Sequence, residues 1–308
     1  MNLISVITPC YNEEKNVEDL YLQVKAVFQG LKYQYEHIFI DNASTDGTIT
    51  ILKRLAQADN NLKIIINSKN FGWVRSPFYG MLQGHGAAVV LLASDLQDPP
   101  GLIIEFIKKW EEGYKIVLGV KTKSKEPALI YKARSLYYGL YNKLSENEIV
   151  RHSTGFGLYD KTIIEIFRQL KEPYPFLKSL IPEIGFKKAT VEYIQEKREK
   201  GISSSSLYRL YDVAIHGIIS DSRVLIRGAT LFGFLASALS LLIAIAYLIL
   251  KITLWERFQL GIASVAIGVF FFASVQLFFI GIIGEYVGAI YTHVKDRPLV
   301  IEKERINF

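Results

Sequence analysis

Two long stretches without a charged residue constrain this 308-residue chain more than any other feature. They cover Gly228–Leu250 and Phe258–Gly284. About 20 consecutive apolar residues allow a helix to span the hydrocarbon core of a bilayer, where a helix satisfies its own backbone hydrogen bonds. The alternative is a pair of buried helices in a large soluble core, but such helices rarely run this far without a charge. The pattern predicts a two-span transmembrane hairpin over 223–290, followed by a tail over 291–308.

The charges around these stretches predict their orientation. Lys and Arg are concentrated on the two outer flanks, whereas the short connection between the stretches carries few of them. Cytoplasmic flanks of membrane helices carry an excess of Lys and Arg. We therefore expect a multi-pass protein of the cell (plasma or inner) membrane, with its amino-terminal domain and its tail in the cytoplasm. The basic residues of the flanks are Arg223, Arg227, Lys295, Arg297, Lys303 and Arg305.

The composition excludes several classes of protein. Half of the residues are hydrophobic and 21% are charged, which rules out a disordered chain. The single cysteine, Cys10, excludes a disulfide framework and a cysteine-based zinc site. The net charge of +6 suits an anionic partner such as nucleic acid, lipid or a phosphorylated substrate. Since the surplus charge lies by the predicted spans and no nucleic-acid-binding motif is present, we expect a membrane partner and no nucleic acid.

Residues 1–202 alternate short apolar runs with helical patterns. The runs have the length and composition of buried strands, and the segments between them repeat apolar residues at helical spacing. This alternation predicts an α/β domain with an open sheet and helices on both faces. The predicted strands are Leu3–Thr8, His37–Ile40, Lys63–Ile66, Ala87–Ala93, Ile116–Val120 and Ala189–Tyr193. The predicted helices begin at Asn12, at Ser44 or Thr45, and at Pro99.

The segment over 203–222 connects this domain to the uncharged stretches. Its apolar residues repeat at helical spacing, with charged residues on the other faces. Next to a membrane, the pattern predicts an amphipathic helix at the interface. An ordinary surface helix of the α/β domain is the alternative.

Polar clusters follow three of the predicted strands, at Thr8–Glu13, Asp41–Gly47 and Ser94–Pro100. Ligands of open α/β sheets bind outside the carboxyl ends of the strands, so the three clusters predict one binding site. Asp95 and Gln97 flank a single residue, and in an extended segment both side chains point the same way. Their oxygen atoms suit Mg²⁺ or Mn²⁺.

Some of these residues also have ordinary structural explanations. Asp98 can cap the helix that follows it, and Asp95 can serve as a turn residue at the end of its strand. Asn12 is expected to cap its own helix. Tyr11 and Glu13 are therefore the better candidates for contact with a ligand.

The PCYNEE opening, the DNASTDGT turn and the DLQDPP segment, in this order, resemble family 2 glycosyltransferases of the GT-A (Rossmann-like) fold. With the carboxyl-terminal hairpin, they are similar to the polyprenyl-phosphate glycosyltransferases of the dolichol-phosphate-mannose-synthase-like branch. The Gln-x-x-Arg-Trp motif of processive polysaccharide synthases is absent. The resemblance implies an inverting enzyme of cell-envelope polysaccharide synthesis. It would transfer a single sugar from a nucleotide sugar (a UDP-sugar) to polyprenyl (undecaprenyl) phosphate, with Mg²⁺ or Mn²⁺.

The resemblance also implies roles for individual residues. Asp95 and Gln97 would hold the metal on the diphosphate, and Asp98 would act with Asp95 in catalysis. Lys121 and Arg134 would lie near the acceptor phosphate. The residues expected to bind the nucleotide sugar are Pro9, Tyr11, Glu13, Asp41, Asn42 and Asp95.

Four places depart from the family pattern. Ala93 and Gly155 stand where relatives usually carry an acid, and Asn42 replaces the second Asp of the turn. Ser203–Ser206 occupies a loop where a Lys is usual. Two alternatives therefore stay open, namely a glycosyltransferase of the same fold with another lipid acceptor and a catalytically weak membrane scaffold. The sequence leaves the oligomeric state open, a homo-oligomer included.

Overall fold

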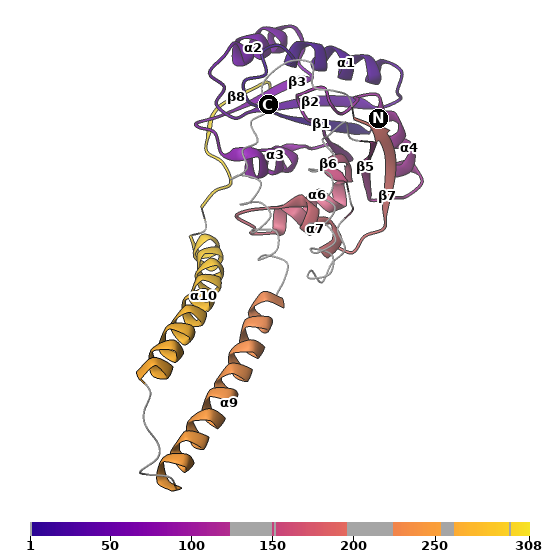
Figure 1. Ribbon diagram of the computed structural model, residues 1–308. Helices are drawn as coiled ribbons and strands as arrows, with labels where there is room; N and C mark the ends of the chain where they lie inside the picture. Colours follow the sequence, from indigo (N-terminus) through magenta and orange to yellow (C-terminus); the bar gives the residue numbers. More distant parts are fainter. Residues whose placement is uncertain (1, 124–149, 151, 196–223, 254–261, 296) are drawn as a thin grey trace. The chain divides into compact units, whose positions relative to one another are not determined.

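The chain divides into an α/β unit and a helical unit of two long helices (Figure 1). The structure is a computed structural model that describes residues 2–123, 150, 152–195, 224–253, 262–295 and 297–308. The predicted amphipathic helix over 203–222 and the predicted acceptor residue Arg134 lie outside the described residues.

The α/β unit is built on an eight-stranded mixed sheet. Its strands are β1 (Leu3–Cys10), β2 (Gln34–Asp41), β3 (Leu62–Asn67), β4 (Ala88–Leu91), β5 (Ile116–Lys123), β6 (Ser153–Asp160), β7 (Lys188–Ile194) and β8 (Glu302–Ile306). The order across the sheet is β7-β5-β6-β4-β1-β2-β3-β8. Strands β3, β2, β1 and β4 are parallel, as are β5 and β7, whereas β6 and β8 run antiparallel to their neighbours.

Helices cover both faces of this sheet, which confirms the predicted α/β architecture (Figure 1). Side chains of a strand alternate between faces, so a strand that helices cover on both sides carries apolar residues on both faces. In β2, Phe39 packs into one core cluster while Ile38 and Ile40 pack into the other. The first face carries α1 (Val17–Gln29), α2 (Thr48–Ala58) and α4 (Leu102–Glu111), and the second carries α3 (Gly72–Gln83), α6 (Lys161–Gln169) and α7 (Leu177–Glu183).

The predicted helix starts near the polar clusters are wrong. Helix α1 begins at Val17 because Asn12 has a left-handed backbone, with φ of 56°. The side chain of Asn12 instead accepts a hydrogen bond from the backbone N–H of Thr45 at 2.7 Å. Helix α2 follows Gly47, and neither Ser44 nor Thr45 caps it. The polar residues at these strand ends therefore bind one another across two loops.

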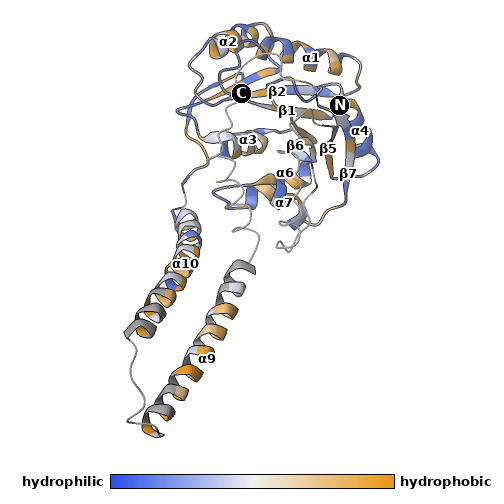
Figure 2. Cartoon of the chain, viewed as in Figure 1, coloured by the Kyte–Doolittle hydropathy of each residue, from blue (hydrophilic) through white to orange (hydrophobic). Residues whose placement is uncertain are grey.

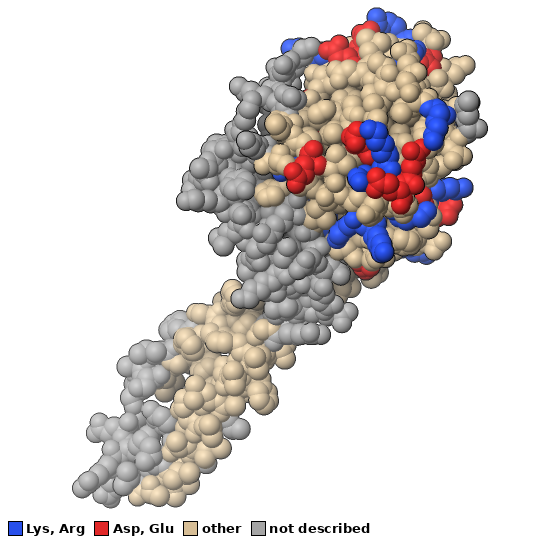
Figure 3. Space-filling view, turned by 90° about the vertical axis from the view of Figure 1, so that its right-hand side faces the viewer, with Lys and Arg blue, Asp and Glu red and all other residues tan. Residues whose placement is uncertain are grey.

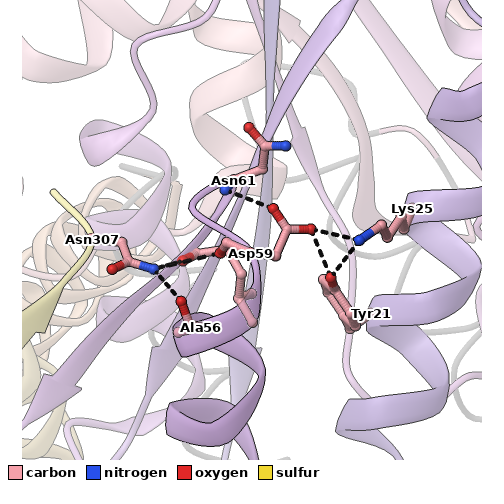
Figure 4. A network of polar contacts seen from close by, with 7 residues as sticks. Tyr21, Lys25, Ala56, Asp59, Asn61 and Asn307 are labelled. Atoms are coloured by element: carbon pink, nitrogen blue, oxygen red, sulfur yellow. Dashed lines mark hydrogen bonds and ion pairs between the residues drawn. The ribbon is translucent and has the colours of Figure 1, made fainter.

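The carboxyl-terminal residues 297–308 belong to the α/β unit, which corrects the prediction of a separate tail over 291–308. Strand β8 pairs with β3 and closes an edge of the sheet, where unpaired backbone groups would otherwise be exposed. The side-chain amide of Asn307 donates to the carbonyl oxygens of Ala56 at 2.8 Å and Leu62 at 2.9 Å. Figure 4 shows Asn307 beside the turn that joins α2 to β3.

The helical unit consists of α9 (Val224–Thr253) and α10 (Ile262–Val294), both largely apolar (Figure 2). Phe232 and Phe279 bring the two helices into contact, with ring centroids 5.8 Å apart. By length and composition, one segment of the described helices, Phe271–Val294, could cross a membrane. In α9 the corresponding segment is the shorter Thr230–Ser240, so the second span stays a prediction.

Candidate active site

A pocket of about 1390 Å³ lies at the carboxyl ends of β1, β2 and β4. It is larger than the roughly 300–1,000 Å³ typical of a small-molecule site. Tyr11, Asn42 and Asp95, which follow these three strands in turn, all line it. The three polar clusters therefore meet at one site, as the rule for open α/β sheets predicts.

The first cluster forms one wall of the pocket. Pro9, Tyr11 and Glu13 all line it. Tyr11 is 41% exposed, so its ring is available for stacking. Glu13 is buried, and its carboxylate accepts a hydrogen bond from the side-chain amide of Asn16 at 2.6 Å. Both side chains are placed to contact a ligand, and their part in nucleotide binding stays a prediction.

Of the two residues expected beside the nucleotide, Asn42 lines the pocket and Asp41 does not, so a contact of Asp41 with the nucleotide stays a prediction. The buried carboxylate of Asp41 accepts hydrogen bonds from the backbone N–H of Ser44 at 2.8 Å and from the Ser44 hydroxyl at 2.5 Å. Burial raises the pKa of Asp41, and the Ser44 hydrogen bonds partly offset this effect. Ala43, which lies between Asp41 and Ser44 in the chain, adopts a left-handed φ of 62°. The carboxylate of Asp41 thus stabilises the turn that follows β2.

Asn42 lines the pocket and uses all the hydrogen-bonding capacity of its amide. Its Oδ1 accepts from the side-chain amide of Asn67 at 3.1 Å and from the backbone N–H of Phe71 at 2.9 Å. Its Nδ2 donates to Asn70 Oδ1 at 3.0 Å and to the Gly72 carbonyl at 3.1 Å. A carboxylate has no donor and could not make the last two bonds. The departure from the family's Asp therefore has a structural reason, because Asn42 holds the loop that lines the pocket.

The segment around Asp95 is a turn and not an extended strand. Leu96 has a left-handed φ of 57°, and the backbone N–H of Gln97 donates to Asp95 Oδ1 at 3.3 Å. Asp95 lines the pocket and Gln97 does not. The expectation that both side chains point the same way is wrong, because it assumed an extended backbone. The metal role of Gln97 stays a prediction without support from this geometry.

Asp98 lines the pocket and is buried, at 4% exposure. The hydroxyl of Tyr193 donates a hydrogen bond to its carboxylate. Burial raises the pKa of Asp98; the Tyr193 hydrogen bond and the charge of Lys121 lower it, and the charge of Asp95 raises it again. The cap explanation is wrong, because α4 begins at Leu102 without a side-chain cap. Asp98 is thus held by a tyrosine from β7, whose role sequence patterns did not indicate.

The two carboxylates fit a divalent metal ion that also binds substrate. Mg²⁺ in proteins typically takes one or two carboxylates and completes its shell with phosphate oxygens and water. Both carboxylates line the pocket, and repulsion by the charge of Asp95 raises the pKa of Asp98. A cation would relieve that repulsion. The described residues contain no group of three or more Asp, Glu, His or Cys that could hold a metal without substrate.

Gly155 lies in β6, between two residues that line the pocket. Its φ is +94°, a conformation that residues with a side chain rarely adopt. A Cβ at this position would meet only Leu177, at an ordinary 3.5 Å, and Leu91 at 3.8 Å. The backbone conformation, and not a lack of space, therefore disfavours an acidic side chain here.

Part of the pocket lining is apolar. Leu91, Phe156, Phe176 and Leu177 contribute to it from β4, β6 and the start of α7. Lys121, a predicted acceptor residue, lies in β5 near Asp98 and does not line the pocket. The lining thus combines Asp95, Asp98 and the polar residues that follow β1 and β2 with apolar side chains that no single motif predicted.

Comparisons with known proteins agree with this geometry. Residues 5–167 match Glycosyl transferase family 2. The chain is 34% identical over 298 residues to the glycosyltransferase YkcC of Bacillus subtilis, covering 96% of this chain and 92% of the relative. It is 33% identical over 303 residues to the SfII prophage-derived bactoprenol glucosyl transferase of Shigella flexneri, covering 98% and 97%.

A solved structure shares the fold of the α/β unit. Glucosyl-3-phosphoglycerate synthase from Mycobacterium tuberculosis, in complex with Mn²⁺, UDP and phosphoglyceric acid, has a TM-score of 0.50 and 18% identity. The match covers 71% of this chain and 76% of the synthase. With the family match over residues 5–167, the chain belongs to glycosyl transferase family 2 and is a glycosyltransferase with a GT-A α/β domain.

Proposed function

We propose that this chain transfers a single sugar, with inversion, from a UDP-sugar to polyprenyl (undecaprenyl) phosphate at the cytoplasmic face of the cell membrane. Relatives named bactoprenol glucosyl transferase align with nearly the whole chain, which supports the acceptor. The apolar segment Phe271–Val294 supports attachment to a membrane. The observation that carries the proposal is the pair Asp95 and Asp98 in one pocket with Tyr11 and Glu13.

In this proposal the polar residues of the pocket bind the donor. Pro9, Tyr11 and Glu13 would surround the base, and Asn42 would shape the loop beside it. Asp95 and Asp98 would hold Mg²⁺ or Mn²⁺ together with the diphosphate. The M. tuberculosis synthase was solved with Mn²⁺ and UDP, and the proposal carries both to this chain. When bound, the ion supplies Lewis-acid stabilisation of the charge on the departing diphosphate.

The absence of an acidic side chain at position 155, where the chain has Gly155, supports a phosphate acceptor. An alcohol acceptor needs a positioned general base, a contribution typically worth about 10²–10⁴-fold in rate. A phosphate monoester has a second pKa near ~6 and is already largely ionised at neutral pH. It therefore needs cations that hold it, and no base. The positive φ of Gly155, which disfavours an acid there, suits a phosphate acceptor better than an alcohol.

Transfer is tested directly with purified full-length protein, a panel of nucleotide sugars and undecaprenyl phosphate, with and without EDTA. We expect a glycolipid of the added mass from one donor, and its loss with EDTA. Asp95→Asn should abolish it, whereas Glu105→Gln, which removes an exposed negative charge from α4, should not. Product from no donor would contradict the proposal. Product only with a lipid alcohol would favour the alternative acceptor, and donor binding without product would favour the scaffold.

A further inference from the structure

Two basic side chains, Lys69 and Arg75, lie near the ring of Phe71 at the start of α3; Phe71 lines the pocket, and the two basic residues do not. The guanidinium of Arg75 lies 5.8 Å from the centroid of the Phe71 ring, and the Lys69 ammonium lies 5.2 Å from it. Arg75 also donates a hydrogen bond to the carbonyl oxygen of Pro298 at 2.7 Å. Arg75 therefore joins α3 to the segment that follows α10.

The charges of Arg75 and Arg297 are not compensated by any described carboxylate. Burial, followed by the nearby positive charge of Arg297, lowers the pKa of Arg75. The Nε of Arg75 is buried and has no hydrogen-bond partner among the described residues. Elsewhere in the α/β unit, positively and negatively charged side chains are interleaved, as Figure 3 shows for one face. Lys108 of α4, for example, forms an ion pair with Glu105 at 2.7 Å. Two arginines held together without an acid favour an anionic ligand.

The place of Arg297 in the chain indicates where that ligand comes from. Arg297 follows Val294, the last residue of the candidate span, by three positions. Three residues of extended chain reach at most ~11 Å, and the headgroup layer on each side of a bilayer is roughly 5–8 Å deep. If Phe271–Val294 crosses a membrane, Arg297 lies at the level of the lipid phosphates. Trp73, which is 52% exposed, is the kind of residue enriched at that level.

We propose that Arg75 and Arg297, assisted by Lys69, bind the phosphate of an anionic membrane phospholipid. The inference rests on the membrane placement of Phe271–Val294 in the proposed function and adds a lipid site apart from the sugar-nucleotide pocket. A guanidinium binds phosphate through charge and paired N–H donors. Because Trp73 and Gly72 of the same helix line the pocket, the bound lipid would hold the rim of the active site at the membrane surface.

The test measures thermal unfolding of the full-length protein in a neutral detergent, titrated with short-chain phosphatidylglycerol. We expect a saturable rise in Tm with phosphatidylglycerol, and none with phosphatidylcholine or inorganic phosphate at the same concentrations. Arg75→Gln and Arg297→Gln should each weaken the apparent affinity about fivefold, the effect expected for one arginine at an anionic lipid surface. Because Arg297 is exposed, Arg297→Gln is expected to fold even if Arg75→Gln does not.

Lys108→Gln with Lys109→Gln provides a matched control, because it removes two positive charges from α4. Its affinity for phosphatidylglycerol should equal that of the unmodified protein. Unchanged affinity in Arg297→Gln, or an equal rise in Tm with inorganic phosphate, would overturn the inference.

Sugar transfer is measured on the same preparations. Transfer with unaltered lipid affinity in Arg297→Gln leaves the proposed function standing and removes the lipid site. If Arg297→Gln loses lipid affinity but the unmodified protein transfers no sugar, the lipid site stands and the proposed function is refuted.

Discussion

Asp98 lines the candidate site, and its burial makes its ionised form unfavourable for the fold. Its carboxylate is buried, which raises its pKa, and the Tyr193 hydroxyl and the charge of Lys121 work against that effect. A group with a raised pKa in the folded state contributes stability at low pH, and that contribution is lost as the pH rises through the folded pKa. Ionisation of the buried carboxyl therefore opposes folding, and a bound cation would reduce this cost.

Asp98→Asn separates these two effects. The amide oxygen still accepts the hydrogen bond from Tyr193, while the buried charge is gone. We expect Tm at pH 7 to stay equal or rise, and sugar transfer to fall on the order of 100-fold, as for loss of one charge-stabilising group at an active site. Differential scanning fluorimetry and glycolipid mass spectrometry measure the two quantities. A large fall in Tm with intact transfer would show that Asp98 is structural.

Tyr193→Phe tests the hydrogen bond from the other side. Without the hydroxyl, the pKa of Asp98 rises further, because a contribution that favours its ionised form is removed. The acidic limb of the pH–activity profile should therefore move to higher pH, with a loss of about 1–3 kcal/mol of stability for the unsatisfied carboxylate. Tyr33→Phe removes a comparable hydroxyl, which donates to Glu111 on the surface. The same displacement in that control would refute the assignment.

At the scale of elements, β8 illustrates a strand that its own sequence does not predict. Its residues, EKERI, are mostly charged and exposed, and three of the five do not contribute to a core. The strand forms because β3 offers an open edge and because side chains anchor it at its middle and just beyond its carboxyl end. Lys53 pairs with Glu304 at 2.7 Å, and Asn307 bonds two backbone carbonyls beyond the strand. Edge pairing and capping, and not hydrophobic periodicity, decide this element.

Asn307 provides a test of that anchor. Asn307 has a left-handed φ of 62° and donates to the carbonyls of Ala56 and Leu62. Asn307→Ala loses both bonds and adds backbone strain, so we expect a loss of about 1–3 kcal/mol. Asn307→Gly loses the bonds without the strain and should be less destabilised. Chemical unfolding measures both, and equal loss in the two variants would argue against a strained backbone.

For the whole molecule, the chain leaves the α/β unit, forms two apolar helices and returns to complete the sheet. The segment 297–308 is therefore part of the catalytic unit, although it follows the candidate membrane span. A fragment that ends before the helices lacks the strand that covers β3. It exposes the edge and the partly buried groups that β8 protects.

This organisation predicts the behaviour of a soluble fragment. Residues 2–222 alone should be less stable than the same residues joined to 297–308 through a flexible Gly/Ser linker. For a unit of this size, each ~1 kcal/mol of stabilisation corresponds to roughly 2–4 °C in Tm. Thermal unfolding and hydrogen exchange of β3 compare the two fragments. Equal Tm and equal protection of β3 would show that β8 is dispensable for the α/β unit.

Local sequence patterns were enough to predict the fold class, the place of the site and the apolar helices. These features depend on periodicity, on runs of apolar residues and on polar clusters at strand ends, all of which are local. The tertiary structure alone decided which side chains face the pocket. The carboxylate of Asp41 accepts a hydrogen bond from Ser44 and does not line the pocket. Gln97 follows the left-handed Leu96 and does not line the pocket either. The hydroxyl of Tyr193 reaches Asp98 from β7. The direction of a side chain at the end of a strand depends on neighbours brought there by the fold, and a local pattern does not contain them.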